Sequence, residues 1–233
     1  MIAQVFQDFD ERVREIDTFL SHLRTLERPA VAIEYATHRG VKKRNINPDW
    51  MKTLKAASFL LLYNLVESAL RRGLGTVYES MRIDARTYEH LRDEIRNLWI
   101  DQRYHRVDRH SASLRKYQEV AAKLVADVAN DLVVDLADDV LPVSGNLDAD
   151  RVRKVCHLHG IPVSTHWRAL GGSELVTVMK HRNSLAHGNI SFRECGRQYT
   201  TQELEGIKKQ VVIFMRSILR NIGRYVDTRQ YNR

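Results

Sequence analysis

The sequence predicts an all-α fold, a helical bundle that carries a small inserted helical subdomain. Apolar residues recur at helical spacing from one end of the chain to the other. A capping box at 200–203 opens a last helix that we expect to run to Tyr225. The chain has only four prolines in 233 residues, and its hydrophobic content of 43% is typical of globular proteins. This length suits one domain, so we expect a single domain over 1–233 with the insert at 143–170.

The first helix is expected over residues 5–26. One face of this segment is apolar at intervals of three and four residues, which is the pattern of an amphipathic helix. The residues of that face are Phe6, Phe9, Val13, Ile16, Leu20 and Leu23. Pro29 and the basic run 38–44 follow, and we expect them to form a loop.

A long second helix should begin at Asn47-Pro48. Asparagine is a favoured N-cap, and proline suits the first turn because its missing N–H has no partner there. Glycine commonly follows the last turn of a helix, so we expect this one to end near Gly73 or Gly75, or a little beyond. The residues expected to face the core are Leu54, Ala57, Leu61, Leu65 and Ala69.

The middle of the chain predicts two further helices. A shorter one should start after Asp84, and the polar, basic stretch 101–113 is expected to be a connection. Another long helix is expected over 114–140, closed by Pro142 because proline cannot continue a helix. Along it Asp127, Asp131, Asp135 and Asp139 recur every four residues and would form an acidic stripe.

Cap signals define the helices of the last third. Asp148 can cap a small helix that ends near Gly160. Ser173 is expected to cap the next helix, and Gly188 to end it. The following connection, 189–199, could hold a short hairpin, although no residue in it is decisive.

Composition limits the possible partners. The formal net charge is +8 and the pI is about 9.6, which favours a polyanion such as nucleic acid. Cys156 and Cys195 are too few for a disulfide scaffold or a four-thiolate zinc site. Neither a signal-peptide pattern nor a membrane-length apolar run is present. We therefore expect a cytoplasmic protein with no membrane partner, metal or cofactor.

The segment 182–187, Arg-Asn-Ser-Leu-Ala-His, carries the most specific chemistry of the sequence. Arg182 offers a permanently charged, forked set of donors suited to phosphate. His187 has a side chain that exchanges a proton near neutral pH. Asn183 lies one helical turn before His187, on the same face. Phosphate clamp, polar orienter and acid/base are together the minimum set for breaking a phosphodiester bond without metal, so we hypothesise that this segment is catalytic.

A simpler interpretation of the same residues exists. Cations at a helix C-terminus interact favourably with the helix dipole and the last carbonyls, whatever their function. Arg182 and His187 also lie about 140° apart on a regular helix, so they do not share a face. Arg182 would have to reach round the helix, or bind its phosphate in a site shared with a second subunit.

The run Lys180–Gly188 closely resembles the signature of the HEPN superfamily, which is an arginine, a polar residue, three variable positions and a histidine. Two other segments support the resemblance. Tyr63–Ser68 resembles the early helix of the bacterial MAE-type and RiboL-PSP-type groups, and Ser144–Asp148 resembles an insert of those groups. HEPN proteins are helical bundles, and many are metal-independent ribonucleases in toxin–antitoxin and phage-defence systems.

The resemblance implies an endoribonuclease. The ribose 2′-hydroxyl would attack the adjacent phosphate and leave 2′,3′-cyclic phosphate and 5′-hydroxyl ends. A single His187 cannot serve both ends of an in-line displacement, so a homodimer with a composite site is expected. Arg182 would stabilise the transition state, Asn183 would orient His187 or a phosphate, and Glu67 would assist either Arg182 or His187. RNA is the expected substrate, and a protein antitoxin or regulator is a possible partner.

Several basic residues are candidates for binding RNA outside the catalytic group. Arg216, Arg220 and Arg224 recur every four residues on the last helix and could follow an RNA backbone. They could equally be a solvated face, or could pair with the acidic stripe. Lys180 and His181 are further candidates because they flank the motif. The full set is Lys180, His181, Arg216, Arg220 and Arg224.

Two other functions remain open from the sequence. A non-catalytic HEPN-like module could dimerise or bind RNA through its basic surface without cutting it. A nucleotide-binding protein without turnover is the third possibility. Neither of these proteins would cleave RNA. The nucleotide-binding protein would in addition be stabilised against unfolding by added nucleotides.

Overall fold

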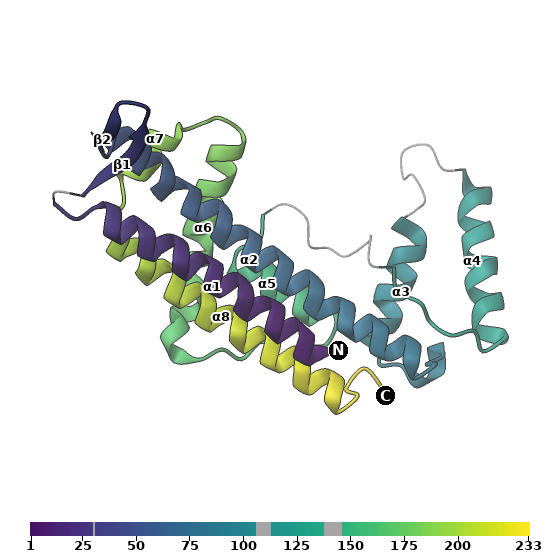
Figure 1. Ribbon diagram of the computed structural model, residues 1–233. Coiled ribbons are helices and arrows are strands. Elements are labelled where there is room, and N and C mark those ends of the chain that lie inside the picture. Colours follow the sequence, from purple (N-terminus) through teal and green to yellow (C-terminus); the bar gives the residue numbers. More distant parts are fainter. Residues whose placement is uncertain (30, 106–112, 138–145) are drawn as a thin grey trace.

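Three long helices form the centre of the fold, which is all-α as predicted (Figure 1). They are α1 (Ile2–Leu26), α2 (Pro48–Ile83) and α8 (Thr201–Asp227), which pack pairwise along their lengths. The computed structural model describes residues 1–29, 31–105, 113–137 and 146–233. None of the helices in this described part is long and apolar enough to cross a membrane.

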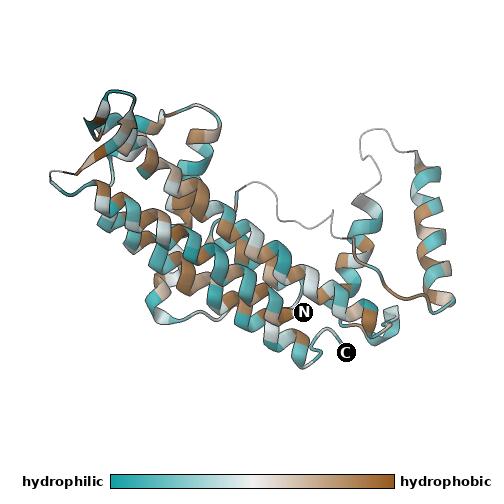
Figure 2. Cartoon of the chain, viewed as in Figure 1, coloured by the Kyte–Doolittle hydropathy of each residue, from teal (hydrophilic) through white to brown (hydrophobic). Residues whose placement is uncertain are grey.

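Shorter elements surround the three long helices (Figure 1). They are β1 (Ala32–Thr37), β2 (Gly40–Asn45), η1 (Tyr88–His90), α3 (Asp93–His105), α4 (Leu114–Ala129), α5 (Ala149–Leu158), η3 (Trp167–Gly172), α6 (Ser173–Ala186) and α7 (Phe192–Arg197). The helices α6 and α7 pack on α2, whereas α3 and α4 lie at its far end. Hydrophobic and hydrophilic residues alternate along α1 and α8 (Figure 2), and the buried residues of both helices belong to the core.

The second helix is longer than its glycines suggested. Asn47 caps it as predicted, accepting from the backbone N–H groups of Asp49 and Trp50. Gly73 does not end the helix but packs against side chains of α8. A Cβ at this position would lie 2.9 Å from the Cδ1 atom of Ile222. The missing side chain therefore makes room for Ile222 of α8, and the helix continues to Ile83.

The residues of α2 that face the core also differ in part from the predicted set. Leu65 and Ala69 are buried as expected, but Leu61 is 37% exposed. Phe59 and Leu62 are fully buried instead. Because α2 is covered by α1, α8, α6 and α7, its apolar residues surround most of the helix and their pattern does not single out one face.

The fourth helix is shorter than predicted. It ends at Ala129 because Asp131 adopts a left-handed conformation (φ +49) and Leu132 N–H donates back to the carbonyl of Asp127. The prediction of an acidic stripe on one helix is therefore wrong for the described residues, because Asp131 and Asp135 lie beyond the end of α4. Asp127 pairs with Arg103 at 3.5 Å, and Asp135 pairs with Arg82 at 3.3 Å. Asp139 lies outside the described residues.

Two connections differ from expectation. The basic run 38–44 lies in an antiparallel hairpin, β1–β2, where a loop was expected. The connection 189–199 contains the helix α7 and not a short hairpin, and Ser191 and Glu194 form the capping box of this helix. Local pattern was too short in both places to decide between helix, strand and loop.

The caps of the last third largely follow the prediction. Asp148 caps α5, and Thr200 with Glu203 forms the capping box of α8. Ser173 is the first residue of α6, while its N-cap is Gly172 with φ +81. A Cβ on Gly172 would come within 2.7 Å of the Phe214 ring, which explains a glycine there.

The described part of the candidate insert packs into the same core as the long helices. Leu147, Val152, Val155 and Ile161 are all buried in it. Buried His159 contacts the carbonyl of Val155 at 2.7 Å, and burial lowers its pKa to about 4. We retain one domain with an insert at 143–170 as a proposal; residues 143–145 lie outside the described residues.

Candidate active site

The segment 182–187 lies at the C-terminal end of α6. The helix stops there because Gly188 adopts a left-handed conformation (φ +71). Its N–H donates to the carbonyl of Leu185, and the next N–H, of Asn189, donates to that of Ser184. This pair of bonds is the Schellman motif. It leaves His187 at the C-cap, with an exposed side chain at the very end of the helix.

Arg182 is held by an aromatic platform on α2. Its guanidinium lies over the ring of Tyr63, 4.5 Å from the ring centroid. Its Nη1 donates to Oδ1 of Asn183 at 2.9 Å. Stacking and this hydrogen bond fix the plane of the guanidinium. Arg182 is partly buried.

A second asparagine completes the support. The side-chain amide of Asn183 donates to Oδ1 of Asn146, in the segment that precedes α5. The next residue, Leu147, is buried, and its backbone forms a hydrogen bond with the Tyr63 hydroxyl. The three segments quoted for the HEPN resemblance, around Tyr63, Asn146 and Arg182, therefore meet at one place.

The charges around Tyr63 are balanced. Burial raises the pKa of its phenol, and the nearby carboxylate of Glu67 raises it further. The Leu147 backbone and the positive charge of Arg182 act in the opposite direction. Tyr63 is thus a neutral platform that lies between a cation and an anion.

The other predicted catalytic residues are not all in contact within one chain. Glu67 pairs with Arg71 at 3.4 Å, one turn along α2. The side chain of Asn183 bonds to Arg182 and Asn146, and the structure gives it no bond to His187. The imidazole of His187 makes no polar contact with any residue that the structure describes.

The flanking candidates Lys180 and His181 have different surroundings. Lys180 is exposed. The His181 ring lies against Phe59, with centroids 4.5 Å apart, and its Nε2 is 2.6 Å from the Tyr199 hydroxyl. Burial lowers its pKa. His181 therefore joins α6 to α2 and to the connection between α7 and α8, and its role in RNA binding stays a prediction.

The arginines of α8 divide into two kinds. Arg216 donates to Asp10 of α1 at 2.7 Å and lies over the Phe9 ring, so it joins two long helices. Arg220 and Arg224 are exposed. The expected alternative of pairing with the acidic stripe is wrong for Arg216, since its partner lies on α1.

Tyr63 and Asn146 were not predicted as site residues. Tyr63 could have been found, because it lies one helical turn before Glu67 and is the only aromatic ring of its segment. Nothing in the sequence alone pairs Asn146 with Asn183, which is 37 positions later.

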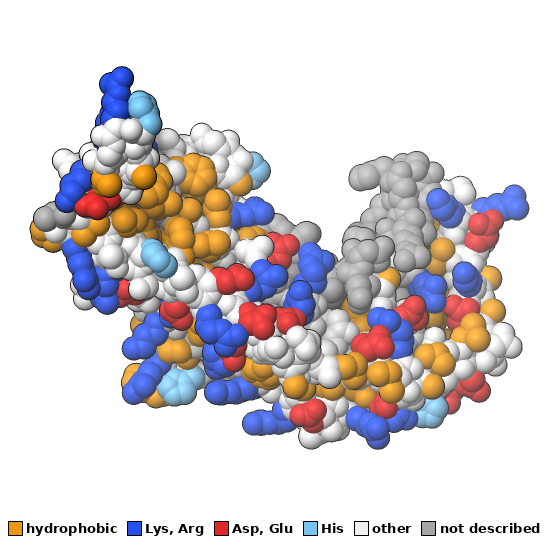
Figure 3. Space-filling model, in the orientation of Figure 1, with side chains coloured by type: hydrophobic (Ala, Val, Ile, Leu, Met, Phe, Trp, Pro, Cys, Tyr) orange, Lys and Arg blue, Asp and Glu red, His pale blue; other side chains and the backbone are white. Residues whose placement is uncertain are grey.

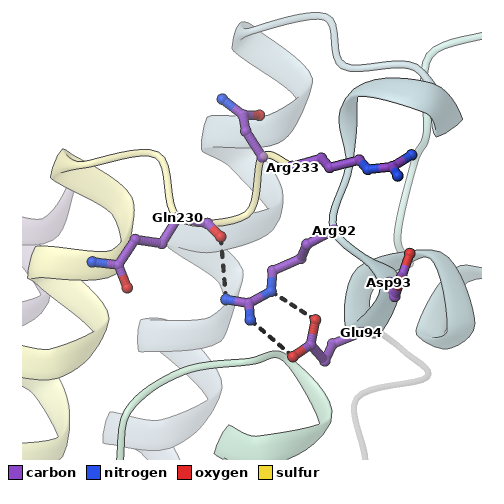
Figure 4. A pocket seen from close by; sticks show the side chains of 6 residues that line it. Arg92, Asp93, Glu94, Gln230 and Arg233 are labelled. Atoms are coloured by element: carbon purple, nitrogen blue, oxygen red, sulfur yellow. Dashed lines mark hydrogen bonds and ion pairs between the residues drawn. The ribbon is translucent and has the colours of Figure 1, made fainter.

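A cavity lies beside the C-terminal residues that follow α8 (Figure 4), and none of the residues discussed above lines it. Its volume is ≈ 400 Å³, and its lining is Arg92, Asp93, Glu94, Gln230, Asn232 and Arg233. Arg92 donates to the Glu94 carboxylate at 2.7 and 2.8 Å, and to the carbonyls of Gly160 and Gln230. These bonds use the donors of the Arg92 guanidinium, so Arg92 links the start of α3 to the segments around Gly160 and Gln230.

The fold and the site together define the class of protein. A helical bundle that carries Arg182, Asn183 and His187 late in the chain, at the end of a helix, has the organisation of the HEPN superfamily. The family model described as MAE_28990-like HEPN matches residues 1–231, and the chain belongs to this family. Neither the curated proteins nor the solved structures contain a match. Membership indicates a nuclease-like or RNA-related function.

Proposed function

We propose that the protein is a metal-independent endoribonuclease that acts as a homodimer. The observation that carries this proposal is the fixed Arg182 guanidinium on Tyr63, in the same motif as an exposed, unengaged His187. A preorganised cation can stabilise the extra charge of a phosphorane-like transition state without reorganising during the reaction. An exposed imidazole at the helix end is free to take a proton from the ribose 2′-hydroxyl.

The second subunit supplies what one chain lacks. In-line displacement needs a base at the 2′-hydroxyl and an acid at the leaving 5′-oxygen, on opposite sides of the phosphorus. Two His187 side chains, related by a two-fold axis, would meet both requirements in one cleft. In this proposal Asn183 positions Arg182 and Glu67 adjusts the charge near Tyr63.

An exposed apolar patch on α2 supports the dimer. Trp50, Leu60 and Leu61, here called the α2 patch, are 41%, 36% and 37% exposed. They lie within an arc of about 100° on the helix, and Leu60 is about 60° from Tyr63. Figure 3 shows orange side chains gathered over this half of α2. An exposed apolar surface on the helix that carries Tyr63 suits an interface between two copies of the chain.

The decisive experiment measures cleavage of a labelled structured RNA in excess EDTA. We expect cuts whose products carry 2′,3′-cyclic phosphate and 5′-hydroxyl ends, because the 2′-hydroxyl is the nucleophile. A single 2′-deoxy substitution at a mapped cut should prevent cleavage there and nowhere else. Cleavage that returns only with added Mg²⁺ would refute the metal-independent mechanism. Binding without any cleavage would favour the interaction module.

The dimer has its own test. Leu60→Glu together with Leu61→Glu should convert a dimer to a monomer, because four buried carboxylates would face each other across the interface. Light scattering after size-exclusion chromatography gives the molecular mass of the variant. We expect RNA cleavage to be lost together with the dimer. The matched control is Ile83→Glu with Val125→Glu, two equally apolar residues that are 65% and 69% exposed elsewhere. An unchanged dimer in the first variant would place the interface on another surface.

The cellular role follows from this activity. An RNA endonuclease that needs no metal would arrest growth, so we propose a cytoplasmic toxin or phage-defence effector, held inactive by a protein antitoxin or other regulator. Expression of the wild-type protein should slow growth, and His187→Ala at equal protein level should not.

A further inference from the structure

The hairpin β1–β2 extends from the bundle, in the connection between α1 and α2 (Figure 1). All six residues of β2 are exposed, as are the four central residues of β1. A two-stranded ribbon is marginally stable by itself, and this one buries little against the bundle. Core packing therefore does not account for its side chains, which are available to a partner.

The strand register sorts these side chains onto two faces. Ile33 is paired with Arg44 and Tyr35 with Lys42, and paired residues lie on the same face. This face, here called the arginine–tyrosine face, consists of Ile33, Tyr35, Lys42 and Arg44 and has no carboxylate. The other face is different, because Glu34 pairs with Lys43 there at 2.7 Å.

The cations of the arginine–tyrosine face are unengaged. Lys42 and Arg44 form no ion pair or side-chain hydrogen bond with the part of the chain that the structure describes. Tyr35, which is opposite Lys42 and diagonal to Arg44, is 45% exposed, and Ile33 is 40% exposed. An exposed aromatic ring flanked by free cations is the arrangement that binds single-stranded nucleic acid, where the ring stacks on a base and the cations contact phosphates.

Charge also distinguishes RNA from a second copy of the chain. The hairpin, residues 32–45, contains four lysines and arginines and one glutamate. Two such hairpins would repel each other along their open edges, whereas a polyanion is attracted. We propose that the hairpin is a second RNA-binding element, in which Tyr35 stacks on an unpaired base while Lys42 and Arg44 hold the adjacent phosphates. This inference rests on the proposed function for the identity of the ligand as RNA.

The position of the hairpin suits the same RNA strand. From Asn47, where the hairpin joins α2, to Tyr63 is 16 residues, or about 24 Å along the helix. His187 lies toward the hairpin end, because α7 follows it closely and Gly196 of α7 abuts the backbone of Lys52. An RNA bound at Arg182 could therefore continue to the hairpin, which would set where the strand enters the site.

The test measures binding separately from cleavage, in the His187→Ala background. Anisotropy of a fluorescein-labelled single-stranded RNA is recorded over a series of KCl concentrations. Lys42→Thr with Arg44→Thr keeps residues that favour strands and removes two charges. We expect Kd to rise about tenfold and the slope of log K against log salt to fall by about 1.4. Tyr35→Ala should raise Kd about fivefold, while Tyr35→Phe should stay within about twofold.

Lys116→Ala with Lys123→Ala is the matched control, because it removes two exposed lysines from α4. Equal Kd values for the hairpin and α4 variants would overturn the inference. It would also be overturned if Tyr35→Phe lost as much affinity as Tyr35→Ala, or if the hairpin variants lost binding only to phosphatidylserine vesicles. Hairpin-dependent binding by a wild-type protein that never cuts RNA would uphold this inference and refute the nuclease.

Discussion

His187→Ala is expected to reduce RNA cleavage by about 10²–10⁴-fold, the usual contribution of a positioned general acid or base. The free energy of unfolding should change by less than about 0.5 kcal/mol, as for most exposed positions. Both expectations have one structural basis. The side chain is exposed at the C-cap of α6 and makes no polar contact with the described residues, so its removal disturbs little packing.

The measurement is a single-turnover cleavage rate in EDTA, together with a denaturant unfolding curve for each variant. His157→Ala is the matched control, since His157 is also an exposed histidine in the last turn of a helix, α5. A histidine that served only the helix dipole would give the same small stability change in both variants and no change in rate. Equal cleavage rates for the two variants would contradict the catalytic role of His187.

Gly196→Ala is expected to destabilise the fold by about 3 kcal/mol or more, at the upper end of overpacking effects. A Cβ at this position would overlap the backbone carbonyl of Lys52. Backbone cannot rotate away as a side chain can, so α7 would have to separate from α2. For a chain of this size the melting temperature should fall by about 6–12 °C, which differential scanning calorimetry would measure.

Gly206→Ala provides the comparison for this effect. Gly206 is an exposed residue of α8, and a Cβ there has no atom within 4 Å. Alanine should stabilise the helix at this position by about 0.5–1 kcal/mol, because it restricts the unfolded chain and favours the helix. If both variants melted at the wild-type temperature, the result would contradict the close contact between Gly196 of α7 and the backbone of α2.

Local signals were reliable where they acted within one turn. Asn47, Asp148 and the Thr200–Glu203 capping box start helices at the expected residues, since a side chain that satisfies free N–H groups needs no distant partner. Apolar spacing predicted α1 to within a few residues. The same reasoning failed for the hairpin β1–β2 and for α7, because each of the two strands and the helix is only six residues long.

The sequence by itself determined the helical class and the main caps, because these depend on neighbours within a few positions. It also predicted Arg182, Asn183 and His187 as site residues. Only the tertiary structure decided that Gly73 lies inside a helix, since its role is to admit Ile222 of α8. It likewise decided that Tyr63 supports Arg182 and that Asn183 bonds to Asn146. Such contacts join residues far apart in the chain, and no periodicity within either segment encodes its partner.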